Sequence, residues 1–134
     1  MGQTSSDHRY LENQLLYVKL LEYNTHPPNT TFTQPFIVYT YQISYQRYSW
    51  ILHKRFNEVH ELYSYMTMRH RSATLHIPFP PKNFQFWRTL EDATVKERGE
   101  RIAIYLESLA TYQECLNDPQ FWEFLEVGKV LFHL

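Results

Sequence analysis

The sequence predicts an α+β fold, in which a three-stranded antiparallel sheet packs against a helical subdomain of three to four helices, with a polyproline loop. Three observations lead to this prediction. Early segments alternate in polarity with a period of two, later segments repeat apolar residues at helical spacing, and "IPFPPK" at residues 77–82 interrupts the helical part. The chain has 134 residues, of which 43% are hydrophobic and 17% aromatic, enough for one domain with a buried core.

Three strands are expected, at residues 15–23, 36–45 and 48–56. In "FIVYTYQISY" every second residue is Ile or Tyr, which is typical of a half-buried strand. The Pro, Asn and Thr content of residues 24–35 predicts a loop before it, and Gln46-Arg47 a short turn after it. Consecutive strands with such connections favour an antiparallel meander.

Helical spacing of apolar residues predicts a first helix over residues 57–69 and a second, long helix that ends near residue 113. Thr89 and Asp92 resemble a capping box at the start of the second. Asp118-Pro119 predicts a last short helix with Asp as N-cap, whose buried face is Phe121, Phe124 and Leu125. Between the first two helices, "IPFPPK" is expected to be a stiff extended arm, because proline fixes φ and removes a backbone donor.

The sequence carries no signature of an enzyme. It has three scattered glycines and therefore no phosphate-binding glycine loop, and no G-x-S-x-G, H-E-x-x-H or C-x-x-C motif. The seven histidines are dispersed, so neither a metal nor a cofactor is expected. Cys115 is the sole cysteine, which excludes an intrachain disulfide and suits the cytoplasm. A net charge of −1 argues against nucleic acid, and no apolar run is long enough for a transmembrane segment.

The charges are unevenly placed along the chain. Residues 47–88 hold seven Lys/Arg and two acids, whereas residues 91–126 hold nine acids and three bases. Within this pattern Arg55, Lys82 and Arg98 come from three different predicted elements, and such side chains bind phosphate. An alternative stays open: both arginines pair with neighbouring acids, Phe56 belongs to the core, and the uneven charge has no function.

Three motifs in this order resemble the PX (Phox-homology) domain, the lipid-binding module of sorting nexins and oxidase subunits. They are "WILHKRFNEVHEL", "IPFPPK" and "ERGERIAIYLESL", and "FWEFL" fits the last helix of that family. The resemblance covers residues 12–127. Where the family often has Arg-Arg-Tyr-Ser-Asp-Phe, this chain has "KRFNEV", which retains the charge and the aromatic ring.

The resemblance implies the roles of four residues. Arg55 would bind the 3-phosphate of a phosphoinositide and Phe56 would stack under the inositol ring. Lys82, held by the proline arm, would neutralise the phosphate that joins inositol to glycerol. Arg98 would donate to the 4- and 5-hydroxyls, which favours phosphatidylinositol 3-phosphate over more highly phosphorylated lipids.

Two further features indicate membrane contact. The loop "NFQFWR" at residues 83–88 offers Phe84, Phe86 and Trp87, and the corresponding loop of the family dips into the bilayer. The alternative, in which one or two of these pack under the loop, applies to part of the set. "MGQTSS" fits the N-myristoylation pattern at Gly2, which would supply a second, weak anchor.

The sequence therefore predicts a flexible arm over residues 1–11, a PX-like domain over 12–127 and a tail over 128–134. We expect a non-enzymatic module that is cytoplasmic and peripheral on endosomal or other phosphoinositide-bearing membranes. The alternative function is a protein-interaction module, in which an SH3-type partner reads the exposed prolines of the arm and the lipid pocket is degenerate.

Overall fold

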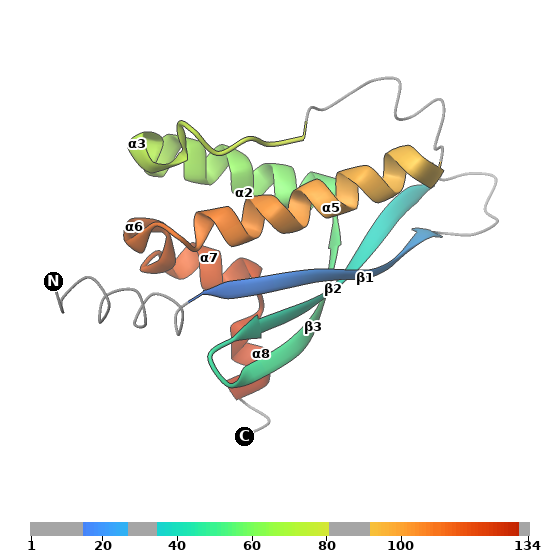
Figure 1. Ribbon diagram of the computed structural model, residues 1–134, viewed down its shortest axis with the longest axis horizontal. Coiled ribbons are helices and arrows are strands. Elements are labelled where there is room, and N and C mark those ends of the chain that lie inside the picture. The colour runs from blue at the N-terminus through green and yellow to red at the C-terminus, as the bar shows by residue number, and fades with distance from the viewer. Residues whose placement is uncertain (1–14, 27–34, 81–91, 132–134) are drawn as a thin grey trace, which may run out of the picture.

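The computed structural model describes residues 15–26, 35–80 and 92–131, and it confirms the α+β fold (Figure 1). The sheet consists of β1 (Leu16–His26), β2 (Phe36–Tyr45) and β3 (Tyr48–Arg55). The helices of the described part are α2 (Phe56–Arg69), α3 (Arg71–Thr74), α5 (Asp92–Leu109), α6 (Gln113–Leu116), α7 (Pro119–Phe124) and α8 (Val127–Leu131). None of these helices is both long and apolar enough to cross a bilayer.

The sheet is an antiparallel meander with strand order β1-β2-β3, as the sequence predicts. The alternation of β2 is confirmed, because Tyr39, Tyr41 and Ile43 are fully buried on the face that the helices cover. A register shift between Leu20 and Glu22 marks a β-bulge in β1, and β1 continues to His26, beyond the predicted end of the strand.

Helix α5 packs closely on the inner face of the sheet. The hydroxyl of Tyr39 donates to the carbonyl of Val95 at 2.9 Å, and that of Tyr41 donates to the carbonyl of Gly99 at 2.8 Å. A Cβ on Gly99 would lie 2.7 Å from the Tyr39 ring, so only glycine permits this approach. Burial raises the pKa of both tyrosines far above the usual value, and they stay neutral donors.

Two predicted helix boundaries differ slightly in the structure. Helix α5 ends at Leu109, before residue 113, where the hydroxyls of Ser108 and Thr111 donate to the carbonyls of Ile104 and Ser108. Side-chain donors of this kind satisfy the last carbonyls of a helix and compete with its continuation. Helix α2 begins at Phe56, directly after β3, and the Glu58 carboxylate accepts the backbone N–H of Arg55 at 2.9 Å.

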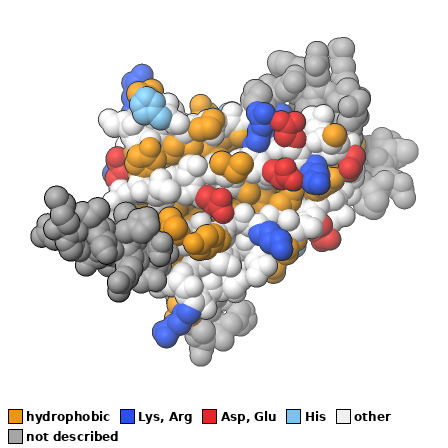
Figure 2. Space-filling model, viewed as in Figure 1, with side chains coloured by type: hydrophobic (Ala, Val, Ile, Leu, Met, Phe, Trp, Pro, Cys, Tyr) orange, Lys and Arg blue, Asp and Glu red, His pale blue; other side chains and the backbone are white. Residues whose placement is uncertain are grey.

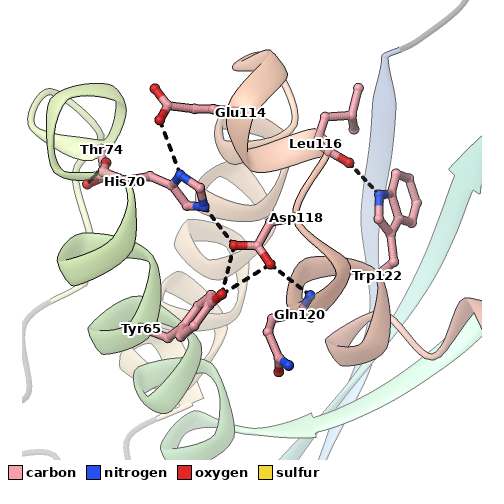
Figure 3. A network of polar contacts seen from close by, with 8 residues as sticks. All are labelled: Tyr65, His70, Thr74, Glu114, Leu116, Asp118, Gln120 and Trp122. Carbon is pink, nitrogen blue, oxygen red and sulfur yellow. Dashed lines mark hydrogen bonds and ion pairs between the residues drawn. The ribbon is translucent and has the colours of Figure 1, made fainter.

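The C-terminal end of α2 meets α6 and α7 in a polar corner (Figure 3). Asp118 is buried and caps α7 by accepting the N–H of Gln120 at 2.9 Å, so the predicted N-cap is confirmed. The same carboxylate lies 2.6 Å from Nε2 of His70 and 2.9 Å from the hydroxyl of Tyr65. Nδ1 of His70 lies 3.2 Å from the Glu114 carboxylate. Since carboxylates only accept, the imidazole is the donor in each hydrogen bond that these contacts form.

The C-terminal helices also cover the inner side of β3. Phe121 and Leu125 are fully buried as predicted, and Nε1 of Trp50 donates to the carbonyl of Leu125 at 2.8 Å. Phe124 is only half-buried, and its ring lies 4.5 Å from the ammonium of Lys54. This contact joins the end of β3 to α7, directly before Arg55 in the chain.

Candidate functional site

Arg55 lies at the junction of β3 and α2, where the chain changes from strand to helix. Its guanidinium carbon is 3.7 Å from the centroid of the Phe36 ring, a close cation–π contact. Its Nε is buried and has no hydrogen-bond partner in the described part of the chain. A guanidinium held by a ring face keeps its in-plane donors for another acceptor, and phosphate is the group that best matches those donors.

Phe36 was not singled out by the sequence, and it lies under Arg55 because of strand pairing. It begins β2, and in the register of the sheet its second neighbour, Val38, is opposite Arg55. On the other side it pairs with His26 of β1, whose ring is 6.2 Å away and nearly parallel. The signal that could have identified Phe36 is the register, which requires the length of the β2–β3 turn as well as the strand pattern.

The second guanidinium, that of Arg98, lies against Phe56. Its carbon is 4.0 Å from the centroid of the Phe56 ring, and the side chain reaches there from α5. Arg98 is 7% exposed and Phe56 9% exposed, so both belong to the edge of the core. Burial lowers the pKa of the Arg98 guanidinium, which nevertheless stays protonated because an arginine ordinarily titrates far above neutral pH.

The first part of the proline arm is anchored by Phe79. The ring of Phe79 stacks on Tyr63 at 4.3 Å between centroids and meets Tyr105 edge to face at 4.8 Å. It also lies 5.8 Å from the ring of Phe56, so the arm and the site share one aromatic cluster. Pro80 is buried as well. This packing fixes the arm at Phe79, one residue before the described segment 35–80 ends.

Several predicted site residues lie outside the described residues. They are Gly2, Lys82, Phe84, Phe86 and Trp87. Of the four predicted head-group residues, the structure brings Phe56 and Arg98 into contact and places Arg55 next to Phe56 in the chain, on the Phe36 ring. The described part of the site therefore contains two guanidinium groups, each supported by an aromatic ring.

Comparisons with known proteins agree with this architecture. The sequence profile of the PX domain matches residues 43–128, well over half of the chain. The chain belongs to the PX domain family. A designed CISK-PX domain shares 15% identity and a TM-score of 0.66, with 80% of this chain and 95% of that chain covered. The mouse SNX19 PX domain with bound sulphate ion shares 16% identity and a TM-score of 0.62, with 84% and 97% covered. No curated protein matches in sequence.

Membership of the family determines the general class of activity. PX domains are phosphoinositide-binding modules that recruit proteins to membranes, and they are lipid-binding modules rather than enzymes. The recognition of the family from three short motifs is therefore confirmed. Peripheral association with membranes follows from the same assignment.

The face of this PX domain that carries α5 is mixed in charge (Figure 2). Acidic and basic side chains alternate there, as in the ion pair of Arg101 with Glu97 at 2.8 Å. A shallow apolar groove of about 320 Å³ lies between α5 and the arm, lined by Pro78, Phe79, Pro80, Arg101 and Ile104. Neither Arg55 nor Arg98 is among its lining residues. The arginines of the candidate site are thus separate from this groove and from the Arg101–Glu97 pair beside it.

Proposed function

We propose that this PX domain binds phosphatidylinositol 3-phosphate and recruits its protein to endosomal membranes. The observation that carries the proposal is the guanidinium of Arg55, 3.7 Å above the Phe36 ring and with Nε unpartnered in the described chain. A cation that is supported by a ring, and that has no carboxylate partner among the described residues, retains its affinity for a phosphate. The mouse SNX19 PX domain holds a bound sulphate ion, an anion of similar shape and charge.

In this proposal Arg55 binds the 3-phosphate, and Lys82 neutralises the phosphate that links inositol to glycerol. Arg98 donates to the 4- and 5-hydroxyls, where an added phosphate would compete for the same space. This arrangement disfavours lipids that carry phosphates at those positions. The anchored proline arm supports the role of Lys82, because a rigid approach limits the entropy lost on binding.

The role of Phe56 requires one movement. Stacking of the inositol ring on the face of Phe56 over which the Arg98 guanidinium lies at 4.0 Å would displace that guanidinium. We therefore infer that Arg98 leaves this face on binding and turns toward the hydroxyls. Such a change is observable by NMR, because the N–H protons of Arg98 lose the ring-current shift of Phe56 when a short-chain lipid is added.

Membrane anchoring completes the proposal. Phe84, Phe86 and Trp87 enter the bilayer, and each buried side chain adds roughly 1.5–3 kcal/mol. An acyl chain on Gly2 would add a second anchor, since one such chain alone gives only marginal binding. The protein is then cytoplasmic in its unbound form and peripheral on the membrane.

The alternative proposal, a protein-interaction module that uses the proline arm, has less support from the described residues. An SH3-type partner reads exposed prolines. Pro80 is buried and Phe79 is packed against the helices, so of these residues only Pro78 is exposed. Binding of this kind would be insensitive to lipid, and the test below separates the two functions.

The test is co-sedimentation with liposomes that each carry one phosphoinositide, performed with the wild type, Arg55→Ala and Arg47→Ala. Arg47 is a matched control, since it is an exposed arginine that lies over a tyrosine ring at the opposite end of β3. We expect selective pelleting with the 3-phosphate lipid, about 100-fold weaker in Arg55→Ala and unchanged in Arg47→Ala. Equal binding to all anionic liposomes, or an equal loss in both variants, would contradict the proposal.

A further inference from the structure

We propose that Phe36 is the positioning residue of the phosphate site, and that its ring holds the Arg55 guanidinium in the orientation that receives the phosphate. The inference rests on the proposed function and deepens it. Its basis is a pair of contacts at one end of the sheet, in which Phe36 of β2 meets the ring of His26 of β1 and the guanidinium of Arg55 of β3.

The ring uses a part of the guanidinium that phosphate does not need. The guanidinium carbon of Arg55 lies over the Phe36 ring at 3.7 Å from its centroid, van der Waals distance for two carbons, which favours packing of the two groups face to face. The electrostatic attraction of the ring quadrupole acts on that face, whereas the N–H donors lie in the guanidinium plane and point outward. A carboxylate would hold the same cation by its donors, as Glu97 holds Arg101 at 2.8 Å, and would leave fewer for a ligand.

Holding the side chain also reduces the cost of binding. An arginine side chain has many rotamers. A ligand that binds a freely rotating arginine restricts it to one rotamer, and the entropy lost in this way weakens the affinity. In this structure the strand register fixes Phe36, and the parallel ring of His26 at 6.2 Å lies beside it. The guanidinium therefore rests on a surface that the sheet itself has ordered. Loss of the ring should weaken phosphate binding although Phe36 touches no phosphate.

The variants are Phe36→Leu, which keeps an apolar side chain without the ring, and Phe36→Tyr, which keeps the ring. Tyr48→Leu is the matched control, because the ring of Tyr48 lies 5.5 Å from the Arg47 guanidinium at the end of β3 opposite to Arg55. Each is titrated with phosphatidylcholine vesicles that carry phosphatidylinositol 3-phosphate, and urea unfolding monitors its fold. We expect about a 10-fold loss of affinity in Phe36→Leu, near wild-type affinity in Phe36→Tyr and no change in Tyr48→Leu.

A second readout does not depend on lipid. In ¹H–¹⁵N spectra the Nε–H resonance of Arg55 should carry the ring-current shift of Phe36 and lose it in Phe36→Leu. An unchanged resonance, or wild-type affinity in a folded Phe36→Leu while Arg55→Ala has lost binding, would overturn the positioning role and leave the proposed function intact. Absence of lipid binding by the wild type would instead overturn the proposed function, and with it the role of Phe36 in phosphate binding.

Discussion

The polar side chains at the two ends of helix α2 differ in their hydrogen bonding. At its C-terminal end the buried Asp118 accepts from His70, Tyr65 and a backbone N–H of α7, so the groups there are bound to one another (Figure 3). At its N-terminal end Arg55 lies on an aromatic ring, with Nε unpartnered in the described chain. The first end is a connected network that favours stability, and the second is the proposed phosphate site.

The difference shows how one helix can serve both purposes. A buried polar group without a partner lowers stability, and it usually marks a site where a partner arrives later. A fully connected network raises stability and has no remaining capacity for a ligand. Substitutions at the Asp118 end should therefore change the free energy of unfolding, whereas those at the Arg55 end should change affinity.

The largest effect on stability is expected from Asp118→Ala. It removes the N-cap of α7 and leaves His70 and Tyr65 without their shared acceptor, which should lower the free energy of unfolding by about 3–4 kcal/mol. Urea unfolding measures this. Asp92→Ala is the control, because that carboxylate also accepts a tyrosine hydroxyl, from Tyr23 at 2.6 Å, but is exposed. An equal loss of stability in both variants would show that the buried network contributes no more than an exposed hydrogen bond.

Gly99→Ala tests the packing that lies between the two ends. The added Cβ would meet the fully buried Tyr39 ring at 2.7 Å, and displacement of that ring should lower stability by about 2 kcal/mol. Gly128→Ala is the matched control, since a Cβ there meets nothing within 4 Å. We expect it to be neutral or stabilising by about 0.5 kcal/mol through helix propensity. The midpoint of thermal unfolding should therefore fall for Gly99→Ala, and it should stay the same or rise for Gly128→Ala.

Acidification should separate the contribution of the Asp118 charge to stability from the contribution of its role as a helix cap. Burial raises its pKa, but hydrogen bonds from His70, Gln120 and Tyr65 outweigh this, so the folded-state pKa is below the usual value. The resulting stabilisation is present above the unfolded pKa of about 3.9 and is lost as pH falls through the folded pKa. Asp118→Asn keeps a capping oxygen, and we expect it to be about 1 kcal/mol less stable than the wild type at pH near 5. If the difference in stability between Asp118→Asn and the wild type does not become smaller at lower pH, this linkage is contradicted.

The smallest change in stability is expected from Arg55→Ala, although its effect on lipid binding is large. The variant loses a cation–π contact and also removes a buried Nε that has no partner in the described chain. These terms oppose each other, so the free energy of unfolding should change by less than about 1 kcal/mol. Chemical denaturation of the protein used for the liposome assay measures it. A loss as large as that of Asp118→Ala would mean that Arg55 is a structural residue.

Much of the fold could be predicted from local pattern. The period of two in residues 36–45 predicts a strand with one buried face, and Asp118-Pro119 predicts the start of α7. Boundaries were less accurate where side chains compete with the backbone, as Ser108 and Thr111 do at the end of α5. The site was predicted through the family resemblance, and its ligand contacts stay a prediction because sequence motifs do not specify distances.

The sequence by itself determined the strands, the main helices and the family, because these depend on periodicity and on short motifs. Only the tertiary structure decided which rings support the arginines. Phe36 meets Arg55 through strand register, and Arg98 meets Phe56 because Gly99 allows α5 to approach the sheet. Such contacts join residues far apart in the chain, and their geometry follows from packing and not from local preference.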